Sequence, residues 1–236
     1  MRLERIFIPA AFAMASVPAQ ATTLINFDSL PGMANSPGSL VPVASRLSNQ
    51  LLATSGVSFS SGGGYVAIVN HAPGCSPCTP TPPNIIGGTT AGNALSYSTP
   101  ITASFFNPAN ASVQATTNFV RVLGDWVPLG RGTATMNIFG TSGNLLGTVS
   151  SADTGPQGQG PELAFSMAGI HRVEFFSDNA TIGFDNFEFG DLISVSAAVP
   201  EPDTWAMMLV GFAGAGLTLR RRRVRNQVAR SHGLIA

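Results

Sequence analysis

The chain has 236 residues, which is enough for one β-rich domain and two short terminal segments. Only 10% of the residues are charged, and the 26 Gly and 17 Pro favour short strands and turns over helices. Residues 22–199 contain four Arg against nine Asp and Glu, a net charge of about −5 that argues against nucleic acid as a partner.

The N-terminus has the pattern of a secretory signal peptide. Arg2 and Arg5 precede an apolar run over residues 6–17, and Ala19 and Ala21 provide small residues at a cleavage site. The alternative is a buried N-terminal helix. We expect residues 1–21 to be removed on export.

Residues 22–192 alternate apolar and polar side chains with period two, and no stretch sustains a helical period. Turn signals rich in Gly, Pro and Asn separate the short segments. The pattern predicts an all-β, two-sheet, jelly-roll-like sandwich. The expected strands are Leu24–Phe27, Val57–Ser60, Tyr65–Val69, Ala94–Tyr97, Ile101–Phe106, Asn118–Leu123, Thr133–Phe139, Leu145–Val149, Leu163–Ser166, Arg172–Phe176 and Thr181–Phe189.

Two of these segments carry more detail. Thr133–Phe139 and Leu145–Val149 flank a Ser-Gly-Asn turn, which predicts a hairpin. In the last strand Phe184 and Phe187 fall on opposite faces of a regular strand. A β-bulge near Asp185 would explain this phase change, as would a strand that is covered on both sides.

A Cys-x-x-Cys pair, Cys75 and Cys78, lies in a Pro-rich loop after His71. In an exported protein this pattern favours a small disulfide. A zinc site with His71 as third ligand and a redox centre are the alternatives, but the first lacks a fourth ligand and the second lacks a following helix.

Asp28 and Asp185 belong to the first and last expected strands, which commonly pair in jelly-roll modules. Carboxylates from separate loops suit a structural calcium ion, and we expect no other cofactor. The alternative is that Asp28 opens a turn and Asp185 caps a bulge.

The C-terminus combines three elements in a fixed order. Pro200-Glu201-Pro202 and Trp205 precede an apolar run to Leu219, and an arginine cluster follows. As a helix the run would be about 22 Å long, short of a hydrocarbon core of about 30 Å. The arginines would stay cytoplasmic and stop transfer of the chain through the membrane. These arginines are Arg220, Arg221, Arg222 and Arg223.

This order resembles the PEP-CTERM sorting tail, in its variant with Trp-Ala after the motif. The resemblance implies a Gram-negative bacterium that makes extracellular polysaccharide. It also implies that an exosortase recognises Pro200, Glu201 and Pro202 and removes a transient membrane anchor. The predicted organisation is then a signal peptide (1–21), a β-sandwich (22–192), a linker (193–199), a sorting tail (200–225) and a cytoplasmic tail (226–236). The body would pass from the inner membrane to the cell surface, the matrix or the medium.

For the body we expect a non-catalytic role in carbohydrate binding or adhesion. The sequence has no nucleophile elbow, no His-Glu-x-x-His zinc motif and no phosphate-binding glycine loop. Asp125 and Glu162 are the pair of acids that a glycosidase would need, but their spacing gives no support for it. The alternative function is a secreted hydrolase that acts on extracellular polysaccharide.

Overall fold

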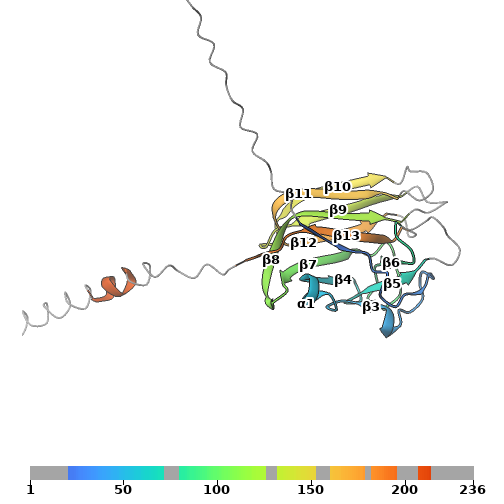
Figure 1. The fold of residues 1–236 in the computed structure, drawn as a ribbon, viewed down its shortest axis with the longest axis horizontal. Coiled ribbons are helices and arrows are strands. Elements are labelled where there is room, and N and C mark those ends of the chain that lie inside the picture. Colours follow the sequence, from blue (N-terminus) through green and yellow to red (C-terminus); the bar gives the residue numbers. More distant parts are fainter. Residues whose placement is uncertain are drawn as a thin grey trace, which may run out of the picture. The chain divides into compact units, whose positions relative to one another are not determined.

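The computed structural model describes residues 21–71, 80–125, 132–152, 160–178, 182–195 and 207–213. The body contains two short helical turns, η1 (Val43–Ser45) and α1 (Leu52–Ser55). Its strands run mostly along the horizontal direction of Figure 1. They are β1 (Thr22–Ile25), β2 (Met33–Ala34), β3 (Arg46–Leu47), β4 (Val57–Ser60), β5 (Val66–Asn70), β6 (Asn84–Gly87), β7 (Ile101–Asn107), β8 (Asn110–Gly124), β9 (Thr133–Phe139), β10 (Leu145–Ala152), β11 (Glu162–Ile170), β12 (Arg172–Ser177), β13 (Phe184–Gly190) and β14 (Ile193–Ser194).

The strands form two groups that face each other. One group has β13 at its centre, paired with β8, β1 and β6, while β11 extends it beyond β8 and β5 beyond β6. The other group runs β10-β9-β12-β7-β4. The β7–β8 hairpin joins the groups through the pair Phe106–Gln114, so the hydrogen-bonded path is continuous. The all-β, jelly-roll-like architecture is confirmed, and its two layers are parts of one folded sheet.

Aromatic side chains fill the space between the layers. Phe187 on β13 contacts Phe59 of β4, Phe105 of β7 and Phe175 of β12, with ring centroids 5.4–6.2 Å apart. These four side chains are at most 1% exposed. Because the contacts cross from one layer to the other, β13 provides the centre of the core.

A second, smaller apolar cluster includes Leu95 and Tyr97, packed against Val69 and Ile85 of β5 and β6. The sequence predicts a strand over Ala94–Tyr97, which is wrong. This segment makes only isolated bridges, and its alternating side chains are buried because it covers the neighbouring strands.

The hairpin of β9 and β10 is confirmed, with Thr133 opposite Ala152 and Phe139 opposite Leu145. The predicted pairing of the first and last strands is also confirmed, because Thr22–Ile25 pair with Phe187–Gly190. The sheet continues past the expected boundary at residue 192, since β14 pairs with Ala115 and Thr116 of β8.

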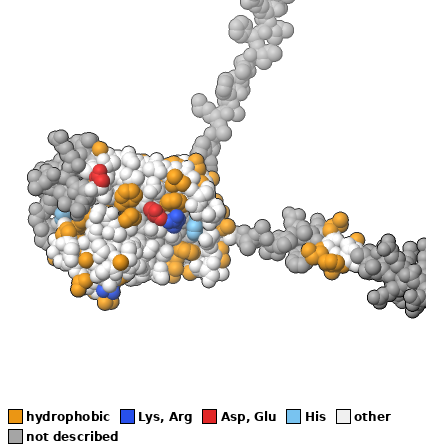
Figure 2. Space-filling view, turned by 180° about the vertical axis from the view of Figure 1, so that it is seen from behind, with side chains coloured by type: hydrophobic (Ala, Val, Ile, Leu, Met, Phe, Trp, Pro, Cys, Tyr) orange, Lys and Arg blue, Asp and Glu red, His pale blue; other side chains and the backbone are white. Residues whose placement is uncertain are grey.

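Charged side chains are sparse on the face of the body seen in Figure 2, where uncharged polar surface and scattered apolar side chains dominate. This agrees with the low charge content of the whole chain.

The C-terminal part is a separate unit that begins at Ser196, and residues 207–213 form a helix in it. In the described parts of the chain no helix is long and apolar enough to span a membrane. The expected span from Trp205 to Leu219 extends beyond residues 207–213 on both sides and stays a prediction. Residues 1–20 of the expected signal peptide lie outside the described residues.

Replacing Phe187 by alanine should remove the centre of the core. We expect Phe187→Ala to lower the free energy of unfolding by about 3–5 kcal/mol, because a large cavity would remain between the layers. Urea denaturation measures the loss. Phe176→Ala is the matched control, since this side chain is only partly buried on the neighbouring β12. An equal loss in both variants would contradict the assignment of the core.

Candidate functional site

A β-bulge in β13 positions the first two polar residues of the site. The pairing of β13 with β8 shifts register between Asp185 and Glu188, and Asn186 has φ 51°. The extra residue lets both Phe184 and Phe187 face the core. Of the two explanations that the sequence allows for the phase change, the register shift supports the β-bulge near Asp185.

The Asp185 carboxylate is fully buried and accepts three hydrogen bonds. The N–H and hydroxyl of Thr81 donate to Oδ2 over 3.0 and 2.9 Å, and the N–H of Asn186 donates to Oδ1 over 2.7 Å. Burial raises the pKa of Asp185 to about 7, although these hydrogen bonds act in the opposite direction. The negative charge of Asp28 raises it further. Asp185 thus attaches the segment before β6 to the bulge.

Asp28 is hydrogen-bonded to the first residue of β6. Its Oδ1 accepts the N–H of Asn84 over 3.2 Å, and the Asn84 amide donates to the carbonyls of Phe27 and Leu30. Within the residues that the structure describes, no group of three or more His, Cys, Asp or Glu side chains is placed to hold a metal ion. Calcium binding by Asp28 and Asp185 stays a prediction.

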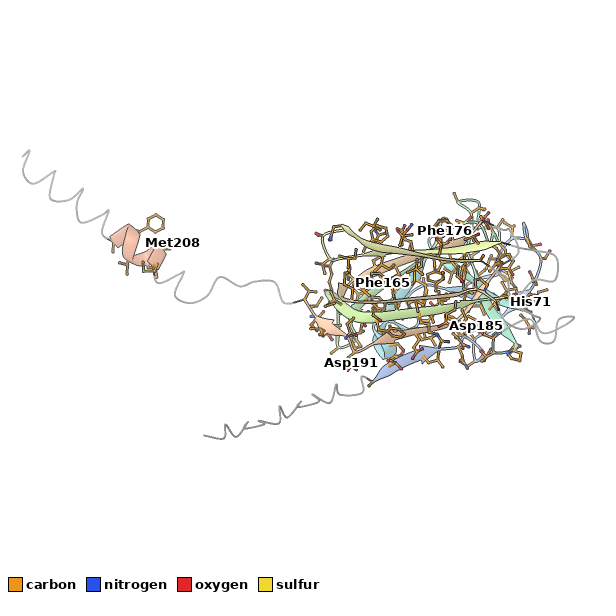
Figure 3. All side chains as sticks on the ribbon, turned by 90° about the horizontal axis from the view of Figure 1, so that it is seen from above. His71, Phe165, Phe176, Asp185, Asp191 and Met208 are labelled. Atoms are coloured by element: carbon orange, nitrogen blue, oxygen red, sulfur yellow. The ribbon has the colours of Figure 1, made fainter. Side chains whose placement is uncertain are left out.

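A buried His–Asp pair lies near the end of β5. His71 Nδ1 is 2.6 Å from Oδ2 of Asp125, whose side chain is fully buried, while that of His71 is 16% exposed. The hydrogen bond to Asp125 raises the pKa of His71, against the effect of burial. Burial, with a smaller contribution from Asp125, also raises the pKa of Tyr97. Figure 3 shows His71 and Asp185 toward one end of the body, away from Asp191.

The sequence does not predict the pairing of His71 with Asp125. Its patterns indicate the histidine as a possible zinc ligand and the acid as half of a glycosidase pair. The available signal is positional, because each residue directly follows a strand, β5 or β8.

A groove of about 480 Å³ opens beside the bulge. Arg121 of β8 lies between two carboxylates, with Nε 2.7 Å from Glu162 Oε1 and Nη1 3.3 Å from Glu188 Oε2. Glu162 is on β11 and Glu188 on β13. Both strands pair with β8, so the two carboxylates lie on either side of Arg121. The groove is lined by Pro80, Arg121, Leu123, Gly124, Gly160, Glu162 and Asn186.

Two glycines of the groove lining, Gly124 and Gly160, pack very closely against neighbouring residues. A Cβ at Gly160 would overlap the carbonyl of Gly124, and a Cβ at Gly124 would lie 2.6 Å from the ring of Pro161. The backbone N–H of Gly124 donates to the Pro161 carbonyl over 2.7 Å. The two glycines therefore let the backbone at the end of β8 pack directly against residues 160 and 161.

Several residues that the sequence singles out lie outside the described residues. They include both cysteines and all residues of the sorting motif and the arginine cluster: Cys75, Cys78, Pro200, Glu201, Pro202, Trp205, Arg220, Arg221, Arg222 and Arg223.

Comparisons with known proteins identify the C-terminal segment. A family model for the PEP-CTERM protein-sorting motif matches residues 198–223. A search of curated proteins finds no match. One matching solved structure is the enzymatically active domain of tailspike protein 4 from bacteriophage CBA120. It is 14% identical over 62% of this chain and 20% of that chain, with a TM-score of 0.29.

The raised pKa values of Asp185 and His71 predict that the stability of the folded protein depends on pH. The pKa of Asp185 rises from 3.8 to about 7 on folding and that of His71 rises above 6.5, so the folded state binds these protons more tightly. The stabilisation is complete below the unfolded values and is lost as pH rises through the folded ones. We expect the melting temperature to fall by several degrees between pH 5 and pH 8, measured by circular dichroism.

Asp185→Asn should flatten this decline, because the side chain no longer titrates. Asp191→Asn is the matched control, since Asp191 is exposed at the other end of the body. A melting temperature that stays constant or increases from pH 5 to pH 8 in the unmodified protein would contradict the role of these groups.

Proposed function

We propose that this chain is a non-catalytic cell-envelope or extracellular-matrix protein whose β-sandwich binds extracellular polysaccharide. The single observation that carries the proposal is the PEP-CTERM protein-sorting motif at residues 198–223. This motif implies an exported protein that an exosortase processes and that is sorted to the cell surface. A compact β-rich body ends at Val195, and the Pro-Glu-Pro sequence begins five residues later.

In this proposal both ends of the chain serve export. The signal peptide directs residues 22 onward across the inner membrane, and Arg220–Arg223 hold the C-terminus in the cytoplasm. The apolar run from Trp205 to Leu219 then anchors the chain until exosortase cuts near Pro200–Pro202. Cleavage passes the body to the surface, the matrix or the medium.

The structure also suggests how such a body could bind a hydrated polymer. Its groove combines a guanidinium, a carboxylate and an amide, and it lies on strands that a well-packed core supports. Side chains of this kind exchange hydrogen bonds with hydroxyl groups. Rigid strands keep them in place without a large ordering cost.

A secreted hydrolase is the second candidate, and the His71–Asp125 pair is the observation that favours it. A histidine oriented by a buried carboxylate is part of many hydrolytic sites. Incubating the purified protein with the strain's own exopolysaccharide separates the two functions. New reducing ends would indicate the hydrolase, whereas co-sedimentation without cleavage would indicate binding alone.

The sorting step is tested by replacing Pro200, Glu201 and Pro202 together with alanine in the native host. We expect the full-length precursor to accumulate in the inner membrane, because exosortase no longer recognises the chain. Immunoblots of membrane, surface and medium fractions provide the measurement. The control variant replaces Asp203 and Thr204, which lie between the motif and Trp205, and should be processed normally. Normal processing of the triple variant would refute the proposed route.

A further inference from the structure

The groove beside Arg121 has an unusual balance of charge. Arg121 is shared by Glu162 and Glu188, so its positive charge is already compensated and the three groups together carry one negative charge. These contacts raise the pKa of Arg121, the hydrogen bond to Glu162 most of all, so the guanidinium stays protonated. A second negative charge entering the groove would therefore be repelled.

The hydrogen-bonding groups of the groove remain only partly used. A guanidinium has five N–H donors, and the contacts to Glu162 and Glu188 involve Nε and Nη1. The Glu162 side chain is 53% exposed and can accept further hydrogen bonds. The Asn186 carbonyl faces the Thr81 hydroxyl at 3.2 Å, which leaves its amide protons for other partners.

The size and floor of the groove suit a ring-shaped ligand. Its volume of about 480 Å³ lies within the range of about 300–1,000 Å³ that is usual for small-molecule sites. Gly124 and Gly160 pack closely against neighbouring backbone and form part of one wall, and Pro80 and Leu123 supply apolar surface. A ligand could lie against this surface while its edges reach Arg121, Glu162 and Asn186.

We propose that this groove binds an uncharged sugar residue of a polysaccharide and rejects uronate and other anionic sugars. Sugar hydroxyl groups both donate and accept hydrogen bonds, which matches a wall of carboxylate acceptor, guanidinium donor and amide. They add no charge to a site that is already net negative. This inference rests on the proposed polysaccharide-binding function and assigns it a location and a ligand class.

The test uses full-length protein in non-ionic detergent, run on native gels that contain dextran, galactomannan or xyloglucan as neutral polymers, or alginate as a polyuronate. We expect retardation by at least one neutral polymer and none by alginate. Glu162→Gln and Asn186→Gly should each weaken the retardation at least tenfold. Glycine tolerates the positive φ at residue 186, so that variant removes the amide with little backbone strain.

Matched controls separate binding from folding. Asn93→Gly changes another asparagine with positive φ (65°), and Glu174→Gln changes an acid paired with Arg172 on the other layer. Both should bind like the unmodified protein. The ligand class would be wrong if alginate retarded the protein as strongly as the neutral polymers do. It would also be wrong if no neutral polymer retarded the protein. Neutral-polymer binding that survives both groove variants would overturn the location.

A separate experiment tests the proposed polysaccharide-binding function itself. If the unmodified protein does not co-sediment with the strain's own exopolysaccharide, polysaccharide binding itself is wrong. If it co-sediments and both groove variants do so equally well, binding stands and the groove assignment alone fails.

Discussion

The packing of β13 against the opposite layer is the interaction on which the rest of the body depends. Phe184, Phe187 and Phe189 are all buried, and their rings contact strands that are far away in the sequence. A regular strand could not turn Phe184 and Phe187 to the same side, because they are three residues apart. The bulge at Asp185 and Asn186 resolves this conflict and gives the core its continuous aromatic centre.

The same bulge determines the chemistry of the surface. It directs a buried carboxylate to Thr81 and an amide to the groove, while Glu188 beyond it pairs with Arg121. The stability of the core and the placement of polar groups therefore have one structural cause. Changes that remove the bulge should affect both, whereas changes at Glu162 alter only the groove.

The sequence was sufficient where the signal is local. The phase change in β13 indicated a bulge as one of two explanations, the Ser-Gly-Asn turn predicted the β9–β10 hairpin, and the order of elements after Val199 predicted the sorting tail. It was insufficient where a pattern depends on tertiary contacts. Ala94–Tyr97 alternates like a strand because it packs on the sheet, and β6 was missed between Pro83 and Gly88, which are turn signals.

The groove could not be predicted from the sequence for a related reason. Arg121, Glu162 and Asn186 are polar residues on strands that look ordinary by themselves, and only the pairing of β8 with β11 and β13 brings them together. The His71–Asp125 pair likewise depends on the places where two strands end. Such sites are properties of topology, and residue spacing does not encode them.

We propose that this chain is a β-sandwich delivered by a removable sorting tail. The most direct test is the intact mass of the protein recovered from the cell surface, the matrix and the medium. We expect a species that begins at Thr22 and ends near Val199. A mass that retains Arg220–Arg223 would contradict it, because the tail would then be a permanent part of the mature protein.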